Sequence, residues 1–449
     1  MHSVKLQYIC GLLAALLCCA GCGQKKAPRY PDVPALPSQP AGIYRDINPR
    51  WSHDGSRIAF LRSTPNRKLQ LFISDRELER PIAMLDAELV SPDRPYSSDA
   101  NRYCSPDTIA WSPDDRLIAF ERIEWFTYED GDRLPGTGLW DYDTITGDTR
   151  PLATHTSHYT SYFYFYHAPT WSPDGRYLAF VGEGVNGQRR IFVHAMKGQA
   201  QIFPSSRFDY YDDSDWPSWR VIRPDSLTDN DDFLDPGVAG IPNVLSFRQG
   251  VRRNAMAPPA ELIRTLSPGT PSADNCRKVT RVTATAYTQI TGDSLPTNVH
   301  VSPRIGSISW SPDSRRLVYT LTPSAHEINR YQIWVSEADG SGARRISPLG
   351  GTGYIAPVWI DNRRIGALSP NGDHYNVVTL DAPDTDSAPG PSNVHLLGRI
   401  DTADCDWSLD RTKIVYAVSS KFRSPENDDP TGLQIFHTGL RRRRVSNVR

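Results

Sequence analysis

The chain has 449 residues, of which 50 are Lys or Arg and 51 are Asp or Glu, giving a formal net charge of -1. Without a charge excess no long-range field attracts nucleic acid, so DNA and RNA are excluded as expected partners. The 39% of hydrophobic residues supply a large core and exclude a wholly disordered chain. The 37 Pro, 20 Tyr and 11 Trp, against only 4 Met, favour strands and turns and predict an all-β protein.

The first 21 residues have the layout of a secretory signal peptide. One charge, Lys5, precedes an apolar stretch and a small-residue end at Ala20 and Gly21. The small-small-Cys sequence that ends at Cys22 resembles the bacterial lipobox, and the resemblance implies that Cys22 is the lipid-attachment residue. Two or more acyl chains there would anchor the protein stably in a membrane. Gly23 directly after Cys22 resembles lipoproteins that are sorted to the outer membrane, which implies that the protein is anchored there and faces the periplasm. An ordinary cleaved signal in a secreted protein is the alternative.

A Pro-rich segment follows the predicted lipid-attachment site. Residues 22–41 contain five prolines and no apolar periodicity, and are predicted to form a semi-extended tether between the membrane and the folded part. The three remaining cysteines, Cys104, Cys276 and Cys405, would lie in an oxidising compartment and can form one disulfide, whose pairing the sequence leaves open.

One pattern recurs along the rest of the chain. Residues 51–60 read WSHDGSRIAF, residues 111–120 WSPDDRLIAF and residues 171–180 WSPDGRYLAF. Residues 310–319 are a close copy, residues 407–416 a fair one and residues 359–368 a decayed one. The Trp and Asp positions predicted to be structural are Trp51, Asp54, Trp111, Asp114, Trp171, Asp174, Trp219, Trp310, Asp313, Trp359, Trp407 and Asp410.

Each copy predicts a β-hairpin. Trp ends one strand, Ser-Pro-Asp-Gly forms a β-turn, and an apolar run begins the next strand. Two further strand signals follow most copies, which makes four antiparallel strands per unit. Units of this size cannot bury both faces alone, so radial stacking into a β-propeller is expected.

The repeats resemble the TolB-type propeller family, whose Trp-Ser-Pro-Asp-Gly repeats also occur in prolyl oligopeptidases. The resemblance implies a propeller over residues 42–449, with seven blades preferred and six as the alternative. The seventh blade rests on a degenerate repeat at Trp219, followed by an insertion within about 222–300. TolB proteins have an α/β domain before the propeller, whereas here only the short tether precedes the first repeat, so no such domain is expected. The chain also has no Gly-x-Ser-x-Gly elbow, which excludes peptidase activity of the prolyl oligopeptidase type.

No local motif indicates a phosphate-binding loop, a dinucleotide site or a zinc helix. A loop with His155, His158 and nearby His167 could gather imidazoles around a transition metal, but solvent-facing histidines are the favoured interpretation. Neither a catalytic residue, a metal nor a cofactor is therefore predicted.

Propeller topology places the loops between the second and third strands, and those between successive blades, on one face. Aromatic and acidic residues concentrate in such loops. The rings would supply contact area for a ligand, and the carboxylates would orient it. The predicted ligand-face residues are Trp125, Tyr128, Tyr159, Tyr162, Tyr164, Tyr166, Tyr210, Tyr211 and Trp216. Packing of these rings onto the blades is the alternative.

These features predict a lipid-anchored envelope propeller that acts by binding, as a scaffold for an envelope protein partner. A carbohydrate-active or metal-assisted enzyme that uses the propeller channel is one alternative. A non-catalytic binder of a glycan or peptide is the other.

Overall fold

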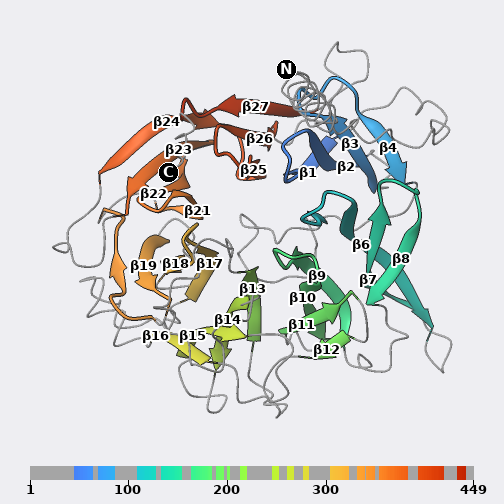
Figure 1. The fold of residues 1–449 in the computed structure, drawn as a ribbon, viewed down its shortest axis with the longest axis horizontal. Coiled ribbons are helices and arrows are strands. Elements are labelled where there is room, and N and C mark those ends of the chain that lie inside the picture. The colour runs from blue at the N-terminus through green and yellow to red at the C-terminus, as the bar shows by residue number, and fades with distance from the viewer. Residues whose placement is uncertain are drawn as a thin grey trace, which may run out of the picture.

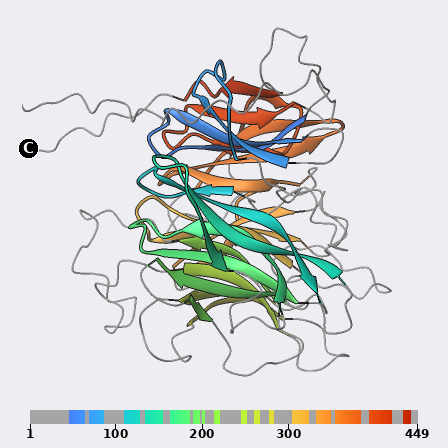
Figure 2. The same ribbon diagram turned by 90° about the vertical axis from the view of Figure 1, so that its right-hand side faces the viewer.

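The fold is seen in a computed structural model, which describes residues 45–63, 69–85, 109–127, 133–153, 163–184, 189–196, 200–202, 213–219, 245–251, 260–266, 277–282, 304–322, 331–338, 340–348, 353–382, 393–418 and 432–440. These residues form seven antiparallel sheets, six with four strands and one with three. The sheets lie in a ring around a central axis (Figure 1), and a view turned by 90° shows them stacked face to face (Figure 2). The predicted all-β propeller with four-stranded antiparallel blades is confirmed.

Consecutive strands pair within each blade, from the inner strand to the rim. The first three blades are β1 (Arg45–Trp51), β2 (Arg57–Ser63), β3 (Leu69–Asp75) and β4 (Ile82–Leu85); β5 (Ile109–Trp111), β6 (Leu117–Thr127), β7 (Arg133–Asp143) and β8 (Thr149–Ala153); and β9 (Phe163–Trp171), β10 (Tyr177–Gly184), β11 (Arg189–Ala195) and β12 (Ala200–Ile202).

The next three blades are β13 (Asp213–Trp219), β14 (Leu245–Val251), β15 (Ala260–Leu266) and β16 (Arg277–Val282); β17 (Arg304–Trp310), β18 (Arg316–Thr322), β19 (Gln332–Glu337) and β20 (Arg344–Arg345); and β21 (Ile355–Asp361), β22 (Arg364–Asn371), β23 (His374–Asp381) and β24 (Val394–Ile400). The last sheet is β25 (Cys405–Trp407), β26 (Lys413–Ala417) and β27 (Leu433–His437). The degenerate repeat at Trp219 supplies the inner strand β13 of the fourth blade, and β14 to β16 lie within the predicted insertion region.

The repeated Ser and Asp build the turn after five of the seven inner strands. In the first blade, Ser52 Oγ donates to Asp54 Oδ1 at 2.7 Å and accepts from the backbone N–H of Arg57 at 2.9 Å. The same pair of hydrogen bonds recurs at Ser112, Ser172, Ser311 and Ser408. The decayed sixth copy has no such Ser, and its turn runs from Asp361 to Arg364.

This turn requires one residue in the left-handed backbone region. Gly55 and Gly175 occupy it with φ of 68° and 70°, and Asp115, Ser314 and Arg411 occupy it in other blades with φ of 57°, 62° and 61°. Glycine adopts this conformation without steric cost, whereas an L side chain is strained in it.

Gly55→Ala is therefore expected to lower the free energy of unfolding by about 1 kcal/mol. A Cβ at Gly55 would meet no atom within 4 Å, so the loss would come from the backbone alone. Ser314→Gly is the reciprocal variant and is expected to be neutral or stabilising. Urea denaturation of both variants measures the difference, and an unchanged midpoint for Gly55→Ala would contradict the assignment.

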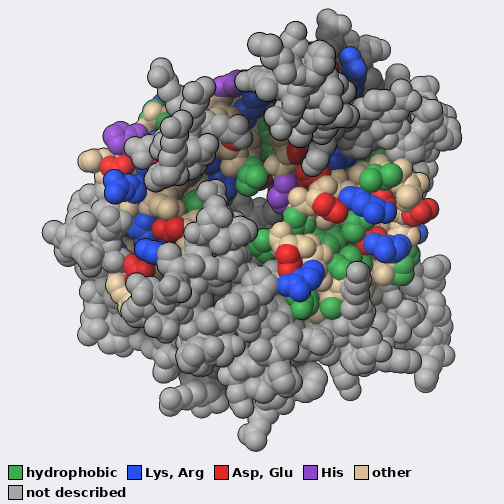
Figure 3. Space-filling model, viewed as in Figure 1, with side chains coloured by type: hydrophobic (Ala, Val, Ile, Leu, Met, Phe, Trp, Pro, Cys, Tyr) green, Lys and Arg blue, Asp and Glu red, His purple; other side chains and the backbone are tan. Residues whose placement is uncertain are grey.

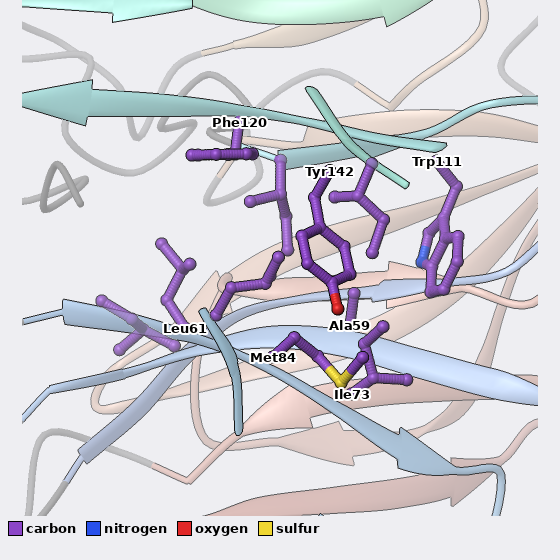
Figure 4. Close-up of a cluster of buried hydrophobic side chains, with 11 residues drawn as sticks. Ala59, Leu61, Ile73, Met84, Trp111, Phe120 and Tyr142 are labelled. Carbon is purple, nitrogen blue, oxygen red and sulfur yellow. The ribbon is translucent and has the colours of Figure 1, made fainter. Parts of the chain in front are cut away.

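The core lies between neighbouring blades. One cluster joins Leu61 and Ile73 of the first blade to Trp111, Phe120 and Tyr142 of the second (Figure 4). The repeat Trp also reaches the preceding blade through its indole N–H. Trp111 Nε1 donates to the Arg50 carbonyl at 3.1 Å, and Trp171 Nε1 donates to the Ala110 carbonyl at 3.1 Å.

A cation from each of three blades lies over the Trp of the next. The guanidinium of Arg57 lies 4.6 Å from the ring centroid of Trp111, and that of Arg316 lies 5.1 Å from Trp359. Lys413 of the last blade occupies the equivalent position, with its ammonium 6.0 Å from Trp51 of the first blade. The same contact that links successive blades therefore also closes the ring.

Carboxylates also join β1 to the last blade, at the contact that closes the ring, named here the closing seam. Asp404 Oδ2 accepts from the backbone N–H of Asn48 at 2.8 Å, and Asp406 Oδ2 accepts from that of Trp51 at 2.8 Å. From the other side, Asp46 Oδ2 accepts from the Gly432 N–H at 2.7 Å. Within the described residues, no strand of the first blade pairs with a strand of the last, so side chains and backbone N–H groups hold the seam.

Candidate binding face

The strand order defines two faces of the ring. Six of the seven inner strands end at their Trp, and β21 ends two residues after Trp359. The turns after the first and third strands of each blade lie on this side of the ring, named here the turn face. The connections after the second strand, and those between blades, lie on the other side, named the loop face. The hairpin of β6 and β7 has 11 residues in each strand, against seven or eight in most second strands. It therefore extends further toward the loop face than its neighbours.

The structure describes only part of the predicted ligand-face set. Trp125 lies on β6, opposite Pro135 near the loop-face end of the long hairpin, and not in the loop where the sequence pattern put it. Tyr164 belongs to β9 and Trp216 to β13, so both lie on inner strands instead of in the loops where the sequence pattern put them. The residues outside the described part of the chain are Tyr128, Tyr159, Tyr162, Tyr210 and Tyr211.

Tyr166 has a different role from the one expected. Its side chain is fully buried, and its ring packs edge-on against Phe180 at 5.8 Å and Phe192 at 6.1 Å between centroids. The expectation that this ring faces a ligand is corrected, because strand alternation in β9 turns it into the core between the second and third blades. His167 is also buried on β9, whereas His155 and His158 lie outside the described residues.

A polar cluster on the sixth and seventh blades was missed by sequence reasoning. His374 begins β23 after the turn at Gly372, and its ring nitrogens lie 3.3 Å from Asp373 and 3.6 Å from Asp401. Asp401 lies in the connection to the seventh blade, so both connections open onto the loop face. Sequence reasoning missed the cluster because its parts are 27 residues apart, although the Asn371-Gly372 pair marks the hairpin.

A tyrosine borders the same cluster. The Tyr416 hydroxyl donates to Gln434 Oε1 at 2.6 Å. Partial burial raises the pKa of Tyr416 above its usual value, and the negative charge of Asp401 raises it further. The phenol is therefore neutral at physiological pH and serves as a hydrogen-bond donor. This arrangement of a neutral phenol, an imidazole and exposed carboxylates suits recognition of cationic or hydroxyl-bearing groups.

Figure 3 shows a hollow at the centre of the ring, bordered by charged, apolar and histidine side chains. Several buried or half-buried acids near the inner strands have a structural partner. Glu121 Oε1 accepts from the Ala168 N–H at 3.2 Å, and Asp46 and Asp404 bind backbone N–H groups at the seam. Among the described residues, no three His, Cys, Asp or Glu side chains are grouped as metal ligands. Glu121 and Asp404 thus hold the backbone at the register shifts of β9 and β1, at Ala168 and Asn48, whereas Asp46 holds Gly432 just before β27.

Two further observations concern the predicted anchor and cysteines. In the part of the chain that the structure describes, no helix has the length and apolarity needed to cross a bilayer. Cys405 lies half-buried on β25, whereas Cys104, Cys276 and the predicted lipid-attachment residue Cys22 lie outside the described residues.

No protein-family model matches the chain, and no curated protein matches it. Solved structures do. TolB from Acinetobacter baumannii is 14% identical with a TM-score of 0.38, over 80% of this chain and 64% of that one, so the chain spans less than two thirds of its length. A TolB-like protein from Agrobacterium tumefaciens is 15% identical with a TM-score of 0.40, over 82% of this chain and 96% of that one.

The β-propeller domain of the Trilobed protease from Pyrococcus furiosus is 12% identical with a TM-score of 0.48, over 89% of this chain and 96% of that one. The neighbours thus include TolB-like propeller proteins at low identity. Sequence identities and TM-scores this low carry no argument about function, which must come from the residues of this chain.

Proposed function

We propose that this protein is a lipid-anchored β-propeller of the cell envelope that acts by binding a protein partner on its loop face. The propeller fold suits a binding or scaffold module, because it presents many loops on a rigid ring. The observation that carries the proposal is the gathering of the long β6–β7 hairpin and the cluster around His374 on this one face. The anchor rests on the small-small-Cys pattern at Cys22.

A pair of matched positions tests which face binds. The side chain of His374 on the loop face is 46% exposed, and Ile145 in a turn-face connection is 48% exposed. A photo-crosslinking residue placed at His374 is expected to form an adduct with one envelope protein in intact cells. The same residue at Ile145 is expected to form none.

The aromatic residues and the anchor are tested in the same cells. Alanine at Tyr162 and Tyr211 together is expected to reduce the adduct at least fivefold while leaving the thermal midpoint unchanged. Cys22→Ala is expected to abolish labelling by radioactive palmitate and to release the protein from the membrane fraction. Equal adducts from both faces, or none from the loop face, would contradict the binding role; a labelled Cys22→Ala protein would contradict the anchor alone.

A further inference from the structure

The outer strand of the sixth blade differs from the other outer strands. β24 has seven residues, whereas β4, β8, β12, β16 and β20 have four, five, three, six and two. Open sheet edges invite pairing with other chains, and Lys, Arg or Pro usually discourages it. Such residues occur in β8 (Arg150, Pro151), in β16 and throughout β20, whereas β4 and β12 contain none but are only four and three residues long. The first five residues of β24, Val394 to Gly398, contain none.

The open edge of β24 carries backbone groups for a further strand. β24 is the last strand of its sheet, and no described strand pairs with its outer side (Figure 1). The N–H of Asp381 donates to the carbonyl of Asn393, which makes this a hydrogen-bonded pair. Because antiparallel pairs alternate, the backbone groups of Val394 and Leu396 point away from β23, toward the open edge.

Two large apolar side chains are exposed beside these groups. Val394 is 37% exposed and Leu396 is 58% exposed. Their cross-strand partners, Leu380 and Val378, are buried in the cluster between the fifth and sixth blades, and cross-strand partners share a face. Val394 and Leu396 therefore face the fifth blade, whose outer strand β20 has only two residues and leaves them uncovered.

Arginines flank this apolar pair. Arg399 pairs with Asn376 beyond the bulge in β24, which returns its side chain to the side of Val394 and Leu396. Across the gap, Arg344 pairs with Val335, whose side chain packs toward the sixth blade. We name Val394, Leu396, Arg399 and Arg344 the rim strip. The strip contains no carboxylate, so the strip of a second copy of this chain would offer these arginines no counter-charge, and the charges favour an acidic occupant.

We propose that β24 is a strand-addition site for an extended segment of a partner protein. The segment places alternate apolar residues on Val394 and Leu396 and acidic residues beside Arg344 and Arg399, while its backbone extends the sheet. The site lies at the rim, apart from the loop face, and does not depend on the function proposed for that face.

A cyclised hairpin peptide tests the site, because a pre-organised strand binds with a smaller entropic cost. Its free strand carries the sequence Glu-Thr-Val-Thr-Val-Thr-Glu, and a second hairpin replaces both Glu by Lys. The acidic hairpin is expected to bind saturably to the whole protein in fluorescence anisotropy. Its binding is expected to weaken with added salt, and the Lys hairpin is expected to bind at least tenfold more weakly. Hydrogen exchange should slow at the amides of Val394 and Leu396.

Three variants separate strand addition from general adhesion. Leu396→Pro removes the outward N–H while leaving the bonds to β23, and Leu396→Glu repels the acidic strand; each is expected to weaken binding at least tenfold. Ile82→Glu, at a 42%-exposed position on β4, is the matched control and should bind as the parent does. Circular dichroism checks that each variant is folded.

Two kinds of result would overturn the strand-addition proposal. Absence of saturable binding up to about 1 mM hairpin, or binding that both Leu396 variants leave unchanged, would overturn the proposal. Concentration-dependent dimerisation of the protein that Leu396→Glu abolishes would assign the edge to a second copy, and would overturn the acidic partner as its occupant.

Discussion

Asp46→Ala is expected to lower the free energy of unfolding by about 3–5 kcal/mol, because it leaves a buried guanidinium without its counter-charge. Arg62 Nε donates to Asp46 Oδ1 at 2.7 Å and Arg62 Nη2 to Asp46 Oδ2 at 2.8 Å. The side chain of Asp46 is inaccessible and that of Arg62 is 10% exposed. The variant also removes the acceptor for the Gly432 N–H at the closing seam. Urea denaturation followed by circular dichroism gives the loss.

Two further variants identify the cause. Arg364→Ala breaks an ion pair with Asp361 in which both side chains are about one third exposed, and is expected to cost less than about 1 kcal/mol. The double variant Asp46→Ala/Arg62→Met removes the unpaired charge and is expected to recover part of the stability. A loss of less than about 1 kcal/mol for Asp46→Ala alone would show that neither the ion pair with Arg62 nor the hydrogen bond to Gly432 contributes as argued.

Trp359→Ala is expected to lower the free energy of unfolding by about 3–5 kcal/mol, as for other large aromatic side chains removed from a core. Trp359 is buried, its Nε1 donates to the Ser309 carbonyl at 3.2 Å, and Arg316 lies over its ring. The loss should appear in denaturation followed by circular dichroism, and hydrogen exchange should quicken in β17 and β21, which meet at this contact.

Trp359→Phe separates the contributions of the indole. It keeps most of the apolar contact but leaves the Ser309 carbonyl without its donor, which is expected to cost about 1–2 kcal/mol. Equal losses for the Ala and Phe variants would mean that the hydrogen bond, and not the filled volume, links the fifth and sixth blades.

The local elements of the propeller follow from sequence because each rests on contacts within a few residues. Ser52 and Asp54 form their turn within six residues, and Trp111 and Trp171 repeat the pattern at the same place in later blades. The repeat at Trp219 lacks the Ser and Asp, but its spacing from Trp171 and the Pro shortly before its Trp, as before Trp171 and Trp359, predicted an inner strand that the structure contains.

The elements that sequence reasoning placed wrongly depend on partners elsewhere in the chain. Tyr164 and Tyr166 lie on β9 and not in a loop, because β10 is long enough for Gly184 to pair with Phe163. Alternation along that pairing then decides that Tyr166 is buried, which an aromatic-rich sequence does not reveal.

The closing seam lay beyond local reasoning for the same reason. Asn48 and Asp404 are separated by 356 residues, and nothing near either residue identifies the other. The exposure of Leu396 likewise depends on the shortness of β20 in a different blade. Sequence patterns thus predicted the repeating unit, whereas contacts between units, including the cluster at His374, required the assembled ring.

The seam also bears on how the chain is made and how it can be rearranged. Each described sheet uses strands that are consecutive in the chain, so every blade can be completed in the order in which the polypeptide emerges from a ribosome or a translocon. The ring closes only after Asp404, Asp406 and Lys413 have been synthesised, and no strand of an earlier blade depends on a later strand for its pairing. New termini placed in a connection between two other blades would leave every described sheet intact, which makes this propeller suited to circular permutation.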